Sequence, residues 1–282
     1  MMRAVPFATS LMLALAMLLA SSPVGTAVAA DDLPCEVPDG VVQAAFPMPH
    51  VAAAIAAKKL DVAVLGSASS ALVGPTGMAR GYPGRFEAAL SAQRPGVAVR
   101  VVPYAKSRQS AAEMEARIGE VLAGAKPTLV VWQTGTVDAI RGIDPEEFGT
   151  ALDRGVERLQ AAGVDVVLMN MQFSPRTESM IALDGYLDRM RFVALQRSVN
   201  SFDRFAVMKG WHESGVFDLS AATNKIDMAA SVHACIGRLL ARLVIEGADL
   251  ATAAAAEGAG KPPDGARPSD LARSGGQSGV RK

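Results

Sequence analysis

Histidine and cysteine are scarce in this chain of 282 residues, and neither sign of charge is in excess. Three histidines and two cysteines are present, with no C-x-x-C pair and no paired histidines, so we expect no metal site and no bound cofactor. Lys plus Arg and Asp plus Glu each number 28, which gives a formal net charge of zero. A chain without a basic excess has no field to attract nucleic acid, so we expect no nucleic-acid partner.

Long apolar runs are absent except near the N-terminus. Residues 1–30 have the pattern of a secretory signal: Arg3 is positive, the segment from Phe7 to Ala20 is apolar, and small residues precede a cleavage site near Ala29 or Ala30. No later segment reaches the roughly 18 apolar residues of a transmembrane helix. We therefore expect a periplasmic or secreted protein with no membrane span after the signal is cleaved.

The two cysteines lie at opposite ends of the folded region. In an oxidising compartment an even number of cysteines indicates a disulfide, which here would join Cys35 to Cys235. Such a bridge would fasten the N-terminal arm to the last helix. The alternative is a pair of free thiols, one of them buried in a helix. We predict the bridge.

Composition divides the rest of the chain into three parts. Residues 247–282 are rich in Ala, Gly, Pro and Ser and have almost no large apolar residue, which predicts a disordered tail. Residues 31–60 form an N-terminal arm, and residues 61–246 are long enough for one domain with its own core. The composition does not indicate an oligomeric state.

Apolar runs alternate with amphipathic stretches through the predicted domain. Four runs lack polar alternation, as strands buried on both faces do: residues 61–66, 97–102, 127–135 and 164–172. Helices are expected from near Pro83, over 110–123, from Asp144 to Gly163, over 183–196 and over 226–245. This order predicts an α/β fold, a three-layer α/β/α sandwich around a central parallel sheet. In such sheets ligands bind beyond the carboxyl ends of the strands.

Three segments resemble the SGNH/GDSL hydrolases, a family of serine esterases. They are GSAS at residues 66–69, GTVD at residues 135–138, and NKIDMAASVHACIGRLLARLV at residues 224–244. The resemblance covers roughly residues 61–245 and implies the flavodoxin-like fold of the SGNH hydrolases. It also implies an acyl hydrolase that acts on small or saccharide-borne esters.

The residues that this family uses for its chemistry are replaced here. Its nucleophilic serine corresponds to Ala68, and the Asp before that serine corresponds to Ser67. The side-chain donor of its oxyanion hole corresponds to Val137, and its acid and base correspond to Asn224 and Asp227. A serine esterase needs a hydroxyl with a base in hydrogen-bond reach, and fixed donors for the oxyanion. The standard chemistry is therefore expected to be degenerate.

The resemblance also outlines a ligand or oxyanion region at the strand ends. It consists of Gly66, Ser107, Arg108, Gln133, Gly135, Asp138 and Asn224. Gln133 is a candidate replacement for the missing side-chain donor, provided that it faces the rim, since side chains alternate along a strand. Asp138 matches the Asp of the family's G-x-N-D block and is expected to be structural.

One hypothesis is a divergent esterase with Ser67 or Ser69 as nucleophile and His233 or Asp227 as base. No D-x-x-H sequence exists, and His233 follows Asp227 by six residues, about 240° around a helix, so these two cannot pair within one helix. The alternative for the serines is that they cap the helix after the first strand. The alternative for His233 is a buried, hydrogen-bonded position in a helix interface.

The other hypothesis is a non-catalytic protein that binds a ligand or a partner in the same cleft through Arg108, Gln133 and Asp227. Arg108 and Asp227 would form a bidentate ion pair that fills the cleft. Alternatively, Arg108 would hold an anionic group together with Lys106 and Lys225. The ligand expected from the two hypotheses is a small ester or an anionic small molecule.

Overall fold

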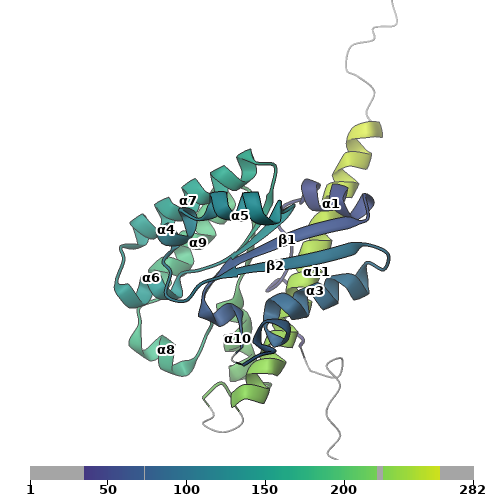
Figure 1. Cartoon of the computed structure of the whole chain (residues 1–282). Coiled ribbons are helices and arrows are strands. Elements are labelled where there is room, and N and C mark those ends of the chain that lie inside the picture. The colour runs from purple at the N-terminus through teal and green to yellow at the C-terminus, as the bar shows by residue number, and fades with distance from the viewer. Residues whose placement is uncertain (1–34, 73, 221–224, 261–282) are drawn as a thin grey trace, which may run out of the picture.

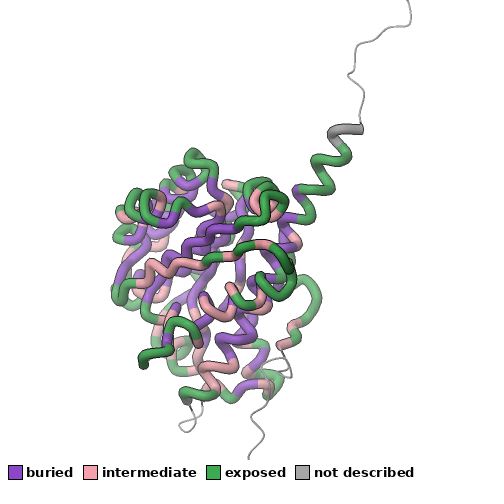
Figure 2. The backbone as a smooth tube through the Cα atoms, turned by 45° about the vertical axis from the view of Figure 1, so that its right-hand side comes forward, coloured by how far each residue is buried: buried purple, intermediate pink, exposed green. Residues whose placement is uncertain are grey.

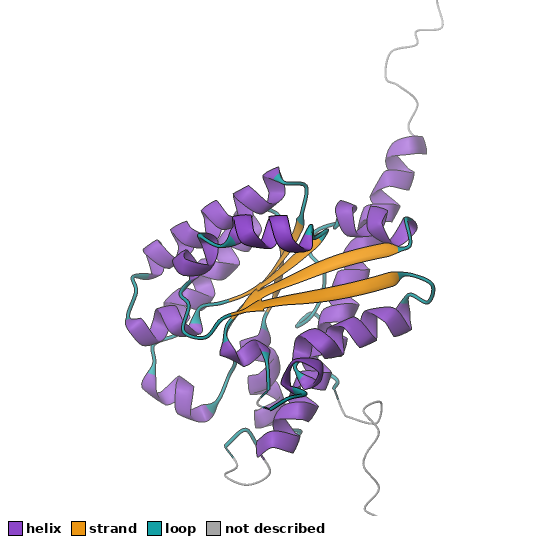
Figure 3. Cartoon of the chain, in the orientation of Figure 1, coloured by secondary structure: helices purple, strands orange, loops and turns teal. Residues whose placement is uncertain are grey.

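The computed structural model describes residues 35–72, 74–220 and 225–260. The predicted signal at residues 1–30, Asn224, and residues 261–282 of the predicted tail lie outside this part of the chain. Within the described part, helices enclose one sheet on both faces (Figure 1, Figure 3).

Five parallel strands form the sheet, in the order β2-β1-β3-β4-β5. Their bounds are Lys59–Gly66 (β1), Ala98–Ala105 (β2), Leu129–Gln133 (β3), Asp165–Met169 (β4) and Asn200–Phe202 (β5). The first four strands confirm the four predicted runs. β1 and β3 are buried almost throughout, because helices cover both of their faces. This strand order is that of a doubly wound, flavodoxin-like sheet, which confirms the predicted fold class.

The sequence does not predict β5, because a strand of three residues is too short to form an apolar run. Its first residue, Asn200, binds the N-terminal arm. The Asn200 Oδ1 accepts hydrogen bonds from the backbone N–H groups of Ala45, at 2.8 Å, and Phe46, at 3.0 Å. The strand ends just before Asp203 and Arg204, so it brings these two residues to the rim of the sheet.

The helices confirm most of the predicted segments, with different bounds. They are α1 (Pro49–Ala56), the 3-10 turn η2 (Ala68–Ser70), α2 (Gly77–Arg80), α3 (Tyr82–Gln93), α4 (Ala111–Glu115), α5 (Ile118–Ala125), α6 (Thr136–Arg141), α7 (Pro145–Ala161), α8 (Pro175–Met180), α9 (Asp184–Gln196), α10 (Arg204–Glu213) and α11 (Lys225–Gly260). The single helix predicted over 110–123 is in fact two, α4 and α5.

The side chains of β1 point alternately to the two faces of the sheet, and the hydrophobic core has one half on each face. Val62 and Val64 contribute to the half built with α1, α3, α10 and α11. Ala63 and Leu65 contribute to the half built with α4, α5, α7 and α9. Since successive side chains of a strand point to opposite faces, this sheet packs against both helical layers.

The last helix is longer than predicted. α11 continues to Gly260, so residues 247–260 are helical, which corrects the prediction of a disordered tail from residue 247. Alanine has the highest helix propensity, so the Ala-rich segment extends a helix that packing has already formed. Residues 252–257 of α11 are exposed and project from the body (Figure 2). α11 is apolar and long enough to cross a membrane, but 67% of its apolar window is buried, as in a core helix.

A disulfide joins Cys35 to Cys235, with their Cα atoms 5.0 Å apart. This confirms the predicted bridge. The bond connects the N-terminal arm to the middle of α11, across a sequence separation of 200 residues. The arm is therefore held by the disulfide, by Asn200 at the edge of the sheet, and by further hydrogen bonds such as that from Met48 N–H to the carbonyl of Gly247.

Candidate functional site

The rim of the sheet begins where β1 ends. Gly66 is the last residue of β1, and η2 follows after Ser67. A Cβ at Gly66 would collide with the Oγ of Ser70, so glycine at this position leaves room for the buried hydroxyl of Ser70. The turn leaves Ala68, the residue that the sequence resemblance places at the nucleophile position, exposed on the rim, while Ser70 is buried.

The serines of this turn hydrogen-bond to Gln133, the last residue of β3. The Gln133 Oε1 accepts from Ser70 Oγ at 2.9 Å and from Ser69 Oγ at 3.2 Å. It also accepts from the backbone N–H and the Oγ of Ser67, both at 3.4 Å. Ser67 takes the N-cap position of η2, the first helical turn after β1, but its side chain makes no cap hydrogen bond. The Gln133 side chain does face the rim loop, but its Nε2 is buried without a hydrogen-bond partner.

His233 lies in the interface between α11 and α3, and among the described residues it forms no hydrogen bond with Ser67 or Ser69. Its Nδ1 accepts a hydrogen bond from the backbone N–H of Tyr82 at 2.8 Å. Burial and the nearby charge of Arg204 lower the pKa of His233 to about 3, so the ring is neutral at physiological pH. Because Nδ1 is the acceptor, Nε2 carries the proton and is a donor rather than a base. The alternative prediction for His233, a buried and hydrogen-bonded position, is confirmed.

Asp227 lies in the first turn of α11 and points outward. Its carboxylate is 89% exposed and forms an ion pair with Arg80 at 3.7 Å. The predicted pairing of Asp227 with Arg108 is therefore wrong. Among the described residues, the Asp227 carboxylate forms no hydrogen bond with a serine of the turn.

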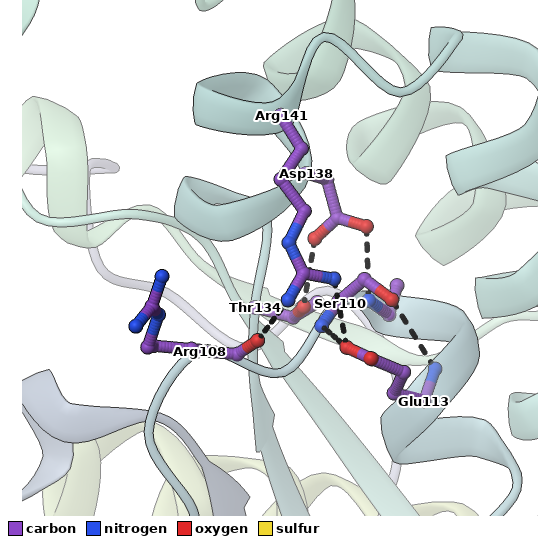
Figure 4. Close-up of polar contacts among 7 residues, drawn as sticks. Arg108, Ser110, Glu113, Thr134, Asp138 and Arg141 are labelled. Atoms are coloured by element: carbon purple, nitrogen blue, oxygen red, sulfur yellow. Dashed lines mark hydrogen bonds and ion pairs between the residues drawn. The ribbon is translucent and has the colours of Figure 1, made fainter.

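Arg108 belongs to the loop after β2, and its backbone has an unusual conformation for a residue with a side chain, at φ +65°. Its carbonyl oxygen accepts a hydrogen bond from Arg141 Nη2 at 2.6 Å, and Arg141 also pairs with Glu113 at 3.0 Å. Figure 4 shows the Arg108 guanidinium directed away from Asp138. The neighbouring Ser107 is exposed.

Asp138 joins two of the rim loops. It is almost fully buried and accepts from the backbone N–H of Ala111 at 2.9 Å and from Thr134 Oγ1 at 3.5 Å (Figure 4). Burial raises the pKa of Asp138, although these hydrogen bonds act against the rise. Gly135, just before α6, has φ +104°, a conformation that favours glycine. Both residues shape the backbone of the rim, which is the structural role expected of Asp138.

The rim contains one charged residue that sequence reasoning missed. Arg204, the first residue of α10, is only 1% exposed. Its Nη1 lies 3.4 Å from Ser69 Oγ, its Nη2 lies 3.5 Å from Gln172 Oε1, and its Nε has no partner. The guanidinium carbon lies 5.6 Å from the centre of the Tyr82 ring. Only the position of Arg204 directly after a strand could have identified it, and that strand is β5, which has no sequence signal.

A cavity of about 490 Å³ opens beside Arg204 and His233, between α8, α10 and α11. Phe173, Met208 and Val232 supply apolar walls. Arg176 from α8 is exposed at this cavity, and no Asp or Glu is among the described residues that line it. The cavity is thus apolar with a positive end.

The fold and the rim together define a protein of the SGNH hydrolase type. A family model described as the Non-GDSL lipase-like family matches residues 34–250, and the chain belongs to this family. A comparison with curated proteins gives no match.

Solved structures share the fold at low sequence identity. TesA is 22% identical with a TM-score of 0.51, and the match covers 64% of this chain and 98% of TesA. A catalytic mutant of Axe2, an acetylxylan esterase from Geobacillus stearothermophilus, is 18% identical with a TM-score of 0.54, over 66% of this chain and 93% of that one. LAE5, an enzyme from the metagenome of Lake Arreo, is 20% identical with a TM-score of 0.53, over 66% and 95%. At these identities the similarity establishes the fold alone.

Proposed function

We propose that this protein is an exported member of its family that binds a small ligand at the rim of the sheet without hydrolysing it. Export is supported by the secretory pattern of residues 1–30 and by the disulfide between Cys35 and Cys235. Descent from hydrolases is supported by the family match and by the fold shared with esterases.

The observation that carries the proposal is the lack of a base beside the rim serines, within the residues that the structure describes. The hydroxyls of Ser67, Ser69 and Ser70 donate to the amide oxygen of Gln133, which is too weak a base to activate a serine. His233 directs its basic nitrogen to a backbone N–H, and the Asp227 carboxylate pairs with Arg80. The contacts in the described part of the rim therefore support ligand binding over hydrolysis.

A divergent esterase based on Ser69 is the second candidate function. Ser69 is partly exposed, and its Oγ lies 3.4 Å from Arg204 Nη1. A neighbouring positive charge favours the deprotonated form of a hydroxyl. This arrangement favours Ser69 over Ser67, which is buried, if any serine of the turn reacts.

Hydrolysis of p-nitrophenyl acetate and p-nitrophenyl butyrate by the purified mature protein distinguishes the two candidates. Wild type, Ser67→Ala, Ser69→Ala and His233→Ala are expected to match the buffer blank. Ser91→Ala is the matched control, because Ser91 is an exposed residue of α3.

Turnover by the wild type that is lost in Ser69→Ala and kept in Ser91→Ala would replace the proposal with the esterase. Turnover that survives in every serine variant would point to a contaminating enzyme, which a second purification step removes before the comparison is repeated.

A further inference from the structure

Arg204 is a buried cation without a counter-ion. No carboxylate of the described residues forms an ion pair or hydrogen bond with it. The guanidinium is still charged at neutral pH, since burial lowers its pKa only to about 10. Buried charges in proteins are normally paired, because an unpaired charge in a medium of low polarity costs several kcal/mol. The nearest ring, Tyr82, is neutral at this pH because burial raises its pKa to about 12.

The hydrogen bonds of Arg204 do not saturate its donors. Its contacts with the Ser69 carbonyl and Oγ and with Gln172 Oε1 span 3.4–3.5 Å, whereas N–H···O bonds cluster near 2.9–3.0 Å. The Nε–H is buried with no partner at all. A guanidinium has five N–H donors in a planar arrangement that matches a carboxylate. The Arg204 guanidinium can therefore donate to a further acceptor.

His233 adds a neutral donor to the same cavity. With Nδ1 committed to the backbone of Tyr82, the proton lies on Nε2. Within the described part of the chain, Nε2 has no hydrogen-bond partner, and His233 lines the cavity. The α11 side of the cavity therefore offers an N–H group rather than a lone pair.

The rest of the cavity limits what can enter. Its volume of about 490 Å³ is within the range of small-molecule sites. Phe173, Met208, Leu219 and Val232 form apolar walls, and the described lining residues carry no negative charge. The buried cation of Arg204 and the neutral donor of His233 match a carboxylate, and the exposed guanidinium of Arg176 adds positive charge at the same cavity.

We infer that this cavity binds a carboxylate that carries an apolar group of a few carbons. The Arg204 guanidinium binds the carboxylate, and His233 Nε2 donates a hydrogen bond to it. The inference rests on the proposed function, because it names the ligand class of the same rim. The apolar part of the ligand lies against Phe173 and Val232. Bound carboxylate then supplies the counter-charge that Arg204 lacks.

Isothermal titration of the mature protein with sodium butyrate, with inorganic phosphate and sodium chloride in parallel titrations at matched ionic strength, tests this inference. Wild type is expected to bind butyrate and neither of the other salts. Arg204→Met is expected to weaken butyrate binding about tenfold or more, as loss of a charge-assisted hydrogen-bonding group does. Arg94→Met is the matched control, because Arg94 is partly exposed and pairs with Asp249 away from the cavity.

Two further variants keep the test decisive if Arg204→Met folds poorly. Leu219→Trp places a large ring in the mouth of the cavity at a partly exposed residue, and is expected to abolish butyrate binding with the arginine intact. Arg108→Met tests the other arginine of the rim. Circular dichroism and the melting temperature report whether each variant is folded.

The outcomes separate this inference from the proposed function. Butyrate binding that survives in folded Arg204→Met and Leu219→Trp, or a wild type that does not bind butyrate, overturns the inference. Binding that is lost in Arg108→Met alone also overturns it, and leaves a ligand at the rim as proposed. Preference for phosphate over butyrate overturns the carboxylate class. Ester turnover, measured separately, overturns only the proposed absence of hydrolysis.

Discussion

Gln133 and Arg204 both form hydrogen bonds with the serines of the rim turn. The amide oxygen of Gln133 accepts hydrogen bonds from Ser69 and Ser70, and the Arg204 guanidinium lies against Ser69. These contacts hold the serines in a turn whose sequence resembles a nucleophile block. The identity of Ala68 predicts the loss of the usual nucleophile from sequence alone. The partners of the neighbouring serines could not be predicted, because Gln133 and Arg204 are distant in the chain.

The histidine in the α11–α3 interface predicts a pH dependence of stability. The pKa of His233 is about 3 in the folded protein, against about 6.5 in an unfolded chain. Between these values the unfolded state binds more protons, so the free energy of unfolding falls as pH falls from about 6.5 toward 3. The contribution of one such group approaches about 1.4 kcal/mol per pH unit in this window.

Urea denaturation of wild type and His233→Gln at pH 7 and pH 4.5 measures this effect. The variant is expected to lose less stability than wild type between the two pH values, since glutamine does not titrate. His212→Gln is the control, because His212 is only partly buried near the end of α10. Equal losses in wild type and His233→Gln would contradict a buried, neutral His233.

At the scale of elements, the length of an apolar run decides whether the sequence predicts a strand. β1, β2, β3 and β4 are long enough for their runs to be read, whereas β5 has three residues. The sequence also misses the break between α4 and α5. Arg117, which lies at this break, hydrogen-bonds to Gln109 at 2.7 Å and to Glu120 at 3.0 Å. Amphipathic periodicity does not reveal contacts of this kind.

Two helical glycines are expected to respond in opposite directions to alanine. Gly119, in the first turn of α5, has open space where a Cβ would lie, so Gly119→Ala is expected to stabilise the protein by about 0.5 kcal/mol. Gly155, in the middle of α7, packs against the buried ring of Trp132, so Gly155→Ala is expected to destabilise it by about 1–3 kcal/mol.

Thermal and urea denaturation of both variants check these signs. The double variant Gly155→Ala with Trp132→Phe is expected to cost less than the sum of the two single changes, because the smaller ring makes room for the methyl group. Additive costs would show that the ring of Trp132 is not the obstacle.

At the scale of the whole molecule, the N-terminal arm and α11 depend on each other. The Cys35–Cys235 disulfide closes a loop of almost the entire domain, and Met48 N–H donates to the carbonyl of Gly247 at 2.8 Å. The double variant Cys35→Ser/Cys235→Ser is expected to lose about 2–5 kcal/mol of unfolding free energy. Urea denaturation of wild type with and without reductant measures the same loss. Reductant should leave the double variant unchanged, and a reductant effect there would point to another cause.

Local features of the sequence determined the class of this protein. Uninterrupted apolar runs predicted the buried parallel strands, and the even number of cysteines predicted the bridge between Cys35 and Cys235. The tertiary structure alone decided the chemistry of the rim. Tyr82 sets the tautomer of His233 across 151 residues, and the short β5 brings Arg204 to the cavity. Hydrogen bonding and desolvation act between residues that only folding brings together, and no local pattern encodes them.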